Sequence, residues 1–259
     1  MHPQDLEPET EALLLRLLPE LPLHWHGASE EEIARMEAIA GRPLPRFYRW
    51  FLSRMGREMG PITYRSLEFS VAKVLSCYDA GLVRPNPRFL LIGYENDEVM
   101  PLHLFYDFDF PARDDARVVK RHFLGGPIYN SFDTFREKLA WGEFLVSRVE
   151  KLPQRCEGSF RGTGDVVKGL DSVMESLGFK KLIPTGDCCA LYDREDAAMS
   201  ISRTPAEPPN LLHFFDLAGP TTGMLRRILG TIGMETRFDI EIESWTPPLP
   251  SHGGAPRAP

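Results

Sequence analysis

Residues 29–55, SEEEIARMEAIAGRPLPRFYRWFLSRM, carry the strongest structural signals in the chain. Ser29 followed by Glu32 forms a capping box, in which each side chain bonds the backbone N–H of the other residue and so starts a helix. Gly41 supplies the left-handed residue that ends such a helix. Pro45 can open a second helix, whose aromatic residues then recur at helical spacing. The stretch therefore predicts a pair of packed helices.

On either side of this pair, the spacing of hydrophobic residues predicts further helices and short strands. A helix is expected before the pair, over residues 7–18. After the pair, the sequence predicts an extended segment over 62–69, a short helix over 71–78, strands over 89–93, 102–110 and 118–123, and a helix from Ser131 to Gly142. In the strand over 102–110, the alternation sends Tyr106 to one face and Asp107 and Asp109 to the other. Helices, then strands, then a closing helix predict an α+β fold with an antiparallel sheet.

A second unit is expected after residue 150. Residues 151–164 gather Pro, Gly, Arg and Ser with little periodicity, as an exposed linker does. The first domain is therefore placed at 1–150, a second and smaller α+β domain at 165–245, and a disordered tail at 246–259. In the second domain, the patterns predict a helix that Asp165 caps, strands over 180–183, 188–192, 197–202 and 211–217, a helix over 222–229, and a last strand over 238–243.

The amino-acid composition and net charge exclude some classes of protein and disfavour others. The chain has 259 residues, of which 42% are hydrophobic, so it can bury a core and is not a disordered protein. Its formal net charge of −7 disfavours binding to nucleic acid or to anionic lipid. The arginines of the helix pair invite a comparison with DNA-binding helix pairs, but the aromatic face between them requires burial.

The sequence also bears on the compartment. Acidic residues follow the N-terminal methionine where a secretory signal needs a basic start and an apolar run, so we expect a cytoplasmic protein. The four cysteines, at 77, 156, 188 and 189, have neither a zinc-binding spacing nor a disulfide framework. They are expected to be reduced and mostly buried.

Candidate catalytic and metal-binding motifs are weak. His24 and His26 offer two ligands where a zinc site needs three or four. The pair Asp107 and Asp109 would share one face of a strand, as carboxylates that hold a divalent cation can, but plain amphipathic alternation explains it as well. No nucleophile elbow or phosphate-binding loop occurs. We therefore expect no catalytic residues, no metal and no cofactor.

The N-terminal half resembles a known family. SEEEIA at 29–34, GRPLP at 41–45, and the Leu-Pro-x-x-Tyr-x-x-Phe-Leu spacing that ends at Leu52 resemble the opening of the SUKH superfamily. The later FLLIG at 89–93 and the helix after Ser131 follow in the matching order. The resemblance covers about residues 28–145, and the second domain resembles no family.

The resemblance implies a bacterial immunity protein that binds a cognate polymorphic toxin, such as a nuclease, and occludes its active site. An acidic surface suits such a partner, because an enzyme that grips nucleic acid has a basic cleft. The partner-binding candidates lie on the predicted turn after the strand over 89–93 and on the strand that follows it: Tyr94, Glu95, Asp97, Glu98, Tyr106, Asp107 and Asp109. Among them, Tyr94 and Tyr106 are the expected anchors.

Two other functions stay open at this point. A regulatory or scaffold protein that binds a different protein partner is the main alternative. An enzyme is the third hypothesis, and it predicts a deep polar pocket with clustered ionisable groups.

Overall fold

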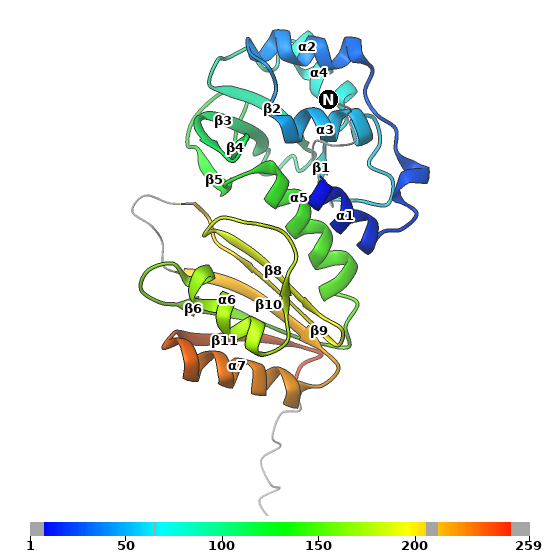
Figure 1. The fold of residues 1–259 in the computed structure, drawn as a ribbon. Coiled ribbons are helices and arrows are strands. Elements are labelled where there is room, and N and C mark those ends of the chain that lie inside the picture. Colours follow the sequence, from blue (N-terminus) through cyan, green and yellow to red (C-terminus); the bar gives the residue numbers. More distant parts are fainter. Residues whose placement is uncertain (1–7, 65, 206–211, 250–259) are drawn as a thin grey trace, which may run out of the picture.

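The computed structural model describes residues 8–64, 66–205 and 212–249. Within these residues the protein is an α+β fold with seven α-helices and two antiparallel sheets (Figure 1). None of the helices in this part of the chain combines the length and apolar character needed to cross a membrane.

The first unit holds five helices and a five-stranded sheet. Its helices are α1 (Pro8–Leu17), α2 (Glu30–Ala40), α3 (Arg46–Met55), α4 (Val71–Asp79) and α5 (Phe135–Phe144). A 3-10 turn, Leu21–His24, follows α1, and one turn of π-helix, Leu145–Val149, continues α5. The sheet is a meander in the order β1 (Leu67–Glu68), β2 (Phe89–Glu95), β3 (His103–Ala112), β4 (Asp115–Arg121) and β5 (Tyr129–Phe132).

The predicted helix pair is confirmed as α2 and α3. The Ser29 Oγ accepts from the Glu32 backbone N–H at 3.2 Å, and the Glu32 carboxylate accepts from the Ser29 N–H at 2.7 Å. Gly41 ends α2 with a φ of 65°, in the left-handed region. The aromatic face of α3 is buried, and Tyr48 and Phe51 from it pack with their ring edges against Phe135 of α5.

The second unit is a six-stranded sheet with two helices on one face. Along the chain it comprises β6 (Gln154–Arg161), α6 (Val166–Ser176), β7 (Lys180–Lys181), β8 (Cys189–Arg194), β9 (Ala197–Ser202), β10 (Leu212–Gly219), α7 (Thr222–Thr236) and β11 (Asp239–Thr246). The strand order is β11-β6-β10-β9-β8-β7. Helices α6 and α7 cover the lower face in Figure 1, and α5 lies against the upper face.

The two units share one hydrophobic core. Leu191 of β8, with Cys189, Ala198 and Ala218, belongs to the same buried cluster as α3, α5 and the first sheet. The opposite face of the second sheet packs with α6 and α7 in a separate cluster that includes Tyr192 and Phe215. Helix α5 therefore lies in the middle of the molecule, between the two sheets.

Two predicted elements are corrected. The segment 151–164 was expected as an exposed linker, but most of it is strand β6, paired with β10 on one side and β11 on the other. Cys156 and Phe160 of this strand are fully buried on one face of the sheet, as the period-two alternation of a strand requires, although most residues of the strand are polar. Ser131 was expected to cap the helix after the first sheet, but Thr134 caps α5 and Ser131 belongs to β5.

The tail predicted for residues 246–259 begins at the end of a strand. Thr246, its first residue, is the last residue of β11. Residues 250–259 lie outside the described residues.

Candidate partner-binding surface

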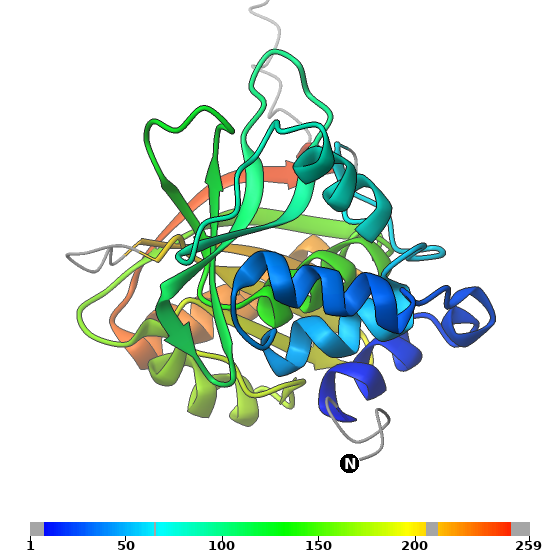
Figure 2. The same cartoon turned by 90° about the horizontal axis from the view of Figure 1, so that it is seen from above.

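One end of the first sheet gathers two loops. The β2–β3 loop (96–102) begins where β2 ends, and the β4–β5 loop (122–128) begins where β4 ends. His103, the first residue of β3, pairs with Arg121, the last residue of β4, so both loops leave the same end of the sheet. Figure 2 shows them projecting side by side beyond the strands.

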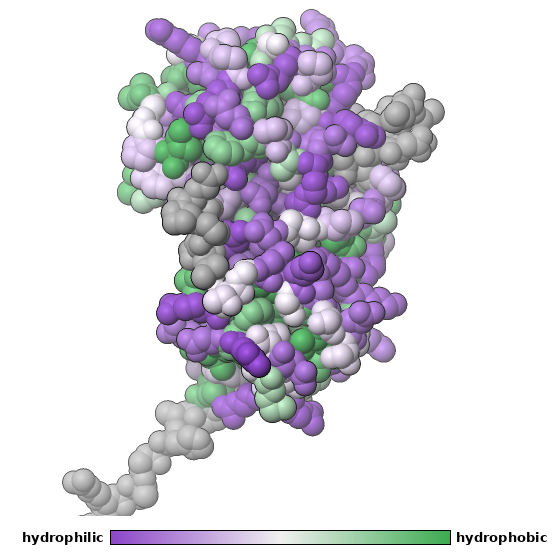
Figure 3. Space-filling view, turned by 60° about the vertical axis from the view of Figure 1, so that its left-hand side comes forward, coloured by the Kyte–Doolittle hydropathy of each residue, from purple (hydrophilic) through white to green (hydrophobic). Residues whose placement is uncertain are grey.

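Apolar side chains are exposed on both loops. Val99 is 93% exposed and Met100 62% exposed on the β2–β3 loop, and Leu124 on the other loop is 90% exposed. Asp97 and Glu98, directly before Val99, are exposed too, and neither forms an ion pair with another described residue. We call these five residues the loop surface. Figure 3, which shows one face of the molecule, also has hydrophobic residues among hydrophilic ones on the upper unit.

Hydrogen bonds hold the base of the β2–β3 loop. The Glu95 carboxylate accepts from the Asp97 N–H at 3.1 Å, and the Asp97 carboxylate accepts from the Val99 N–H at 2.9 Å. The Asn96 N–H donates to the Ser66 carbonyl at 2.8 Å, and the Asn96 side-chain amide donates to the same oxygen at 3.1 Å. These bonds fix where Val99 and Met100 stand, so the loop is presented on a defined base.

Aromatic rings pack beneath the two loops. His103 stacks on Phe123 with ring centroids 3.6 Å apart, and Tyr94 packs on His103 at 4.8 Å. The Lys73 ammonium lies 3.9 Å from the Tyr94 ring centroid, a cation–π contact. The His103 Nδ1 accepts from the Glu95 N–H at 3.1 Å, which requires an unprotonated nitrogen. Burial, with repulsion from His122 second, lowers the pKa of His103 to about 4.

The structure brings together only part of the predicted contact residues. Tyr94 is half-buried under the loops, and Glu95 is buried and holds the loop base, so neither is a protruding contact. Asp97 and Glu98 stand exposed at the surface, as an acidic contact requires. The other three predicted residues lie farther along β3.

Tyr106 was predicted as a contact anchor, and this was wrong. Its ring is fully buried and packs with Tyr48 and Phe135 in the core. Asp107 is also buried, and both of its carboxylate oxygens accept from Arg88 at 2.8 Å. Asp109 is exposed, but it shares the same arginine at 3.1 Å.

Sequence reasoning missed the apolar part of the loop surface. Val99 and Met100 follow four polar residues, so the segment was interpreted as an acidic turn. Leu124 stands next to Gly125 and Gly126, which were interpreted as a plain turn. The available signal was the presence of large apolar residues inside segments whose glycines and acids mark them as exposed loops.

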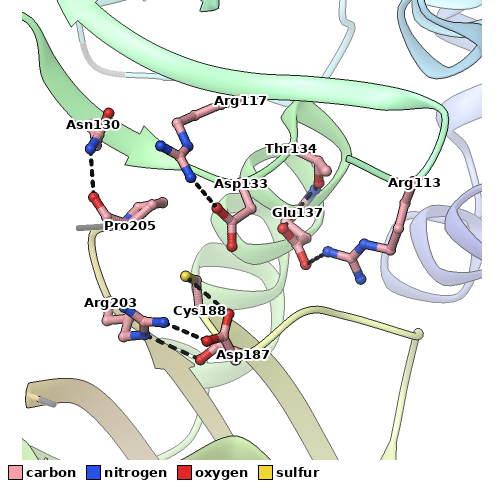
Figure 4. Close-up of polar contacts among 10 residues, drawn as sticks. All are labelled: Arg113, Arg117, Asn130, Asp133, Thr134, Glu137, Asp187, Cys188, Arg203 and Pro205. Atoms are coloured by element: carbon pink, nitrogen blue, oxygen red, sulfur yellow. Dashed lines mark hydrogen bonds and ion pairs between the residues drawn. The ribbon is translucent and has the colours of Figure 1, made fainter. Parts of the chain in front are cut away.

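A polar cluster that could offer metal ligands lies at the junction of the two units (Figure 4). Asp133, just before α5, faces Asp187 and Cys188, just before β8, and their ligand atoms lie within 4.8 Å of one another. Arg203 donates to Asp187 at 2.6 Å, and Arg117 lies 3.7 Å from Asp133, so an arginine already faces each carboxylate. Burial raises the pKa of the Cys188 thiol, which keeps it protonated. This donor set fits a metal ion poorly, and the cluster connects the two units instead.

Glu137 of α5 belongs to the same junction. Its carboxylate is fully buried and accepts from the Arg113 guanidinium, from the Thr134 hydroxyl at 3.0 Å and from the Gly186 N–H at 2.8 Å. The carboxylate therefore bonds the β3–β4 hairpin, its own helix and the segment before β8. A buried charge with three partners of this kind fixes the position of the elements that supply them.

Comparison of the chain with family models and with curated proteins finds no match. The fold and the loop surface therefore carry the functional argument, together with the sequence resemblance described above.

Proposed function

We propose that the protein is an immunity protein that binds a cognate bacterial toxin and covers its active site, with the loop surface as the main contact. The observation that carries the proposal is the exposure of Val99 and Met100 next to the carboxylates of Asp97 and Glu98, which form no ion pair with any other described residue. Hydrogen bonds hold the base of this loop. Exposed apolar side chains are unfavourably solvated in the isolated protein. A partner that buries them removes this unfavourable contact with water and so gains binding free energy.

The two kinds of side chain have different roles in this proposal. Val99, Met100 and Leu124 bury apolar area in the complex and supply affinity. Asp97 and Glu98, on a chain whose net charge is −7, attract a basic surface and speed association. A toxin that acts on nucleic acid carries such a surface around its active site.

The resemblance to the SUKH superfamily supports the proposal independently of the loop surface. It rests on the helix pair α2–α3 and on the strand motif at 89–93, which are parts of the fold that position the loops rather than form them. Many members of that superfamily are immunity proteins.

The experiment first identifies the partner. A photo-crosslinking amino acid replaces Val99 in the full chain, and the crosslinked protein from the native cell is identified by mass spectrometry. The same amino acid at Met234, an 80% exposed apolar residue on α7, gives the matched control. A partner captured from position 99 and not from position 234 is then expressed in a host, alone and with this protein.

The proposal predicts that the captured partner stops growth when it is expressed alone and that the wild-type protein restores growth. The variant Glu98→Lys/Met100→Ser is expected to lose protection, whereas the matched variant Glu235→Lys/Met234→Ser on α7 retains it. A partner without toxicity contradicts the immunity function and favours the regulatory or scaffold alternative. Full protection by the Glu98→Lys/Met100→Ser variant would show that the loop surface is not the contact with the toxin.

A further inference from the structure

A cavity of about 350 Å³ lies on the outer face of the first sheet. It opens to solvent between the α4–β2 connection and the residues that follow β4. Its walls come from Gly81, Leu82, Val83, Arg84, Asn86, Phe89, Phe105, Arg121, Phe123 and Leu124. The volume falls within the range of small-molecule sites and suits a ligand of one or two rings.

The charge in the cavity walls is entirely positive. Arg84 and Arg121 line it, and no aspartate or glutamate does. Among the described residues, neither arginine forms an ion pair with a carboxylate. Arg88 lies nearby, but Asp107 and Asp109 already neutralise it. An anion that enters the cavity would therefore meet two cations without a competing carboxylate in the walls.

Arg121 is held in place by aromatic rings. Its guanidinium carbon lies 4.3 Å from the Phe89 ring centroid and 5.3 Å from that of Phe105. Its buried Nε has no hydrogen-bond partner in the described part of the chain. Burial, with repulsion from Arg88 second, lowers the pKa of Arg121. A partly desolvated guanidinium gains more from an anion than a fully solvated one does.

The rest of the lining is apolar. Phe89, Phe105 and Phe123 are aromatic, and Leu82 and Leu124 are more than half exposed. A ring placed against the phenylalanines would gain stacking contacts and remove these leucines from water. The cavity thus combines an aromatic wall with a cationic one.

We propose that this cavity binds a small organic anion with a planar aromatic body, whose carboxylate or phosphate contacts Arg84 and Arg121 and whose ring packs on the phenylalanines. The site adjoins the partner contact, because Leu124 belongs to the loop surface and also lines the cavity, whereas Asp97, Glu98, Val99 and Met100 do not line it.

The test is calorimetric titration of the full chain with two anions and their neutral counterparts. Indole-3-acetate is compared with indole-3-acetamide, and adenosine monophosphate is compared with adenosine, so the two arms separate a carboxylate from a phosphate ligand. At least one anion is expected to bind with a Kd below about 1 mM, and at least about tenfold more tightly than its neutral counterpart. Failure of both anions to bind, or equal binding of the neutral compounds, overturns the proposal.

Variants assign the binding to this cavity. Arg84→Gln alters an exposed side chain, so it leaves the fold intact, and Arg121→Gln removes the stacked guanidinium. A loss of at least about tenfold in affinity is expected in one or both. Arg161→Gln, on the exposed end of β6, is the control and should bind as the wild type does. Unchanged affinity in both cavity variants contradicts the assignment, as does an Arg121 Nε–H resonance that stays fixed while the anion binds.

Discussion

Asp107 and Asp109 are two residues apart on β3 and share Arg88, but only Asp107 is part of the protein's interior. The Asp107 side chain is 2% exposed and makes two bonds of 2.8 Å to the guanidinium, whereas that of Asp109 is 58% exposed. Removing the acceptor charge from the buried position weakens two charge-assisted bonds at a carboxylate that is shielded from water. The same change at the exposed position is compensated by solvent.

The two aspartates therefore give a matched pair of variants. Asp107→Asn is expected to lower the free energy of unfolding by about 1–2 kcal/mol, a value discounted because Arg88 is partly exposed. Asp109→Asn is expected to lower it by less than about 0.5 kcal/mol. Urea unfolding of the two variants measures both values, and an equal cost at the two positions would contradict the assignment of Asp107 to the interior.

His103 makes the fold sensitive to acid. Its pKa of about 4 in the folded protein lies below the ordinary value of 6.5, since burial disfavours the charged ring. The unfolded chain therefore takes up a proton between about pH 6.5 and 4 that the folded protein does not. The contribution of His103 to stability is present above pH 6.5 and is lost as the pH falls toward 4.

This titration can be followed directly. In a ¹⁵N-resolved NMR titration, the His103 ring is expected to be neutral near pH 6.5, with Nδ1 unprotonated, and to take up its proton with a midpoint near pH 4. A His103→Gln variant assigns the signal. Its stability is expected to fall less than that of the wild type between pH 6.5 and 4.5. Protonation of His103 near pH 6.5 in the folded protein would contradict this description of the ring stack.

At the residue scale, the sequence predicted the alternation of β3 but not which of its faces is exposed. Tyr106 and Asp107 do point to opposite faces, as period-two alternation requires. Both faces are covered in the middle of the strand, so both residues are buried. The packing that buries them comes from segments distant in sequence, including α3, α5 and Arg88, and a strand pattern does not report it.

At the scale of single elements, local signals were the most reliable. The capping box, the left-handed glycine and the cap at Asp165 predicted the starts of α2 and α6 and the end of α2, because each acts within four residues. Strand β6 was missed because Arg, Gly and Ser outnumber its apolar residues. Its burial comes from pairing with β10 and β11, which lie far along the chain.

The capping box of α2 leads to a test of its own. Ser29→Ala removes the acceptor for the Glu32 N–H and is expected to destabilise the protein by about 1 kcal/mol. Ser76→Ala in α4 is the control, because that exposed hydroxyl donates to the Lys73 carbonyl one turn back and does not cap the start of α4, where Ser70 is the cap. Thermal unfolding compares the two variants, and equal melting temperatures would contradict a stabilising cap.

At the scale of the whole molecule, the shared core predicts that the two units unfold together. Leu191 of β8 is fully buried in the cluster that also holds α5 and the first sheet. Leu191→Ala is expected to cost about 2–5 kcal/mol and to lower the stability of both units equally. The exposed Leu23→Ala variant serves as the control and should cost little.

Fluorotryptophan NMR measures this coupling. Trp50 of α3 reports on the first unit and Trp245 of β11 on the second. Urea unfolding of the wild type should show one midpoint for both resonances, and Leu191→Ala should move both midpoints by the same amount. Separate midpoints, or a shift confined to Trp245, would show that the units unfold independently.

The proposed contact depends on more than single elements, because β2, β3 and β4 together place the loop surface at one end of the first sheet. The most direct test is the Kd between this protein and the toxic partner captured at position 99. We expect Glu98→Lys/Met100→Ser to weaken binding by at least about tenfold and Glu235→Lys/Met234→Ser to leave it unchanged. Unchanged binding of the first variant, or an equal loss in both, would contradict the loop surface as the contact with the toxin.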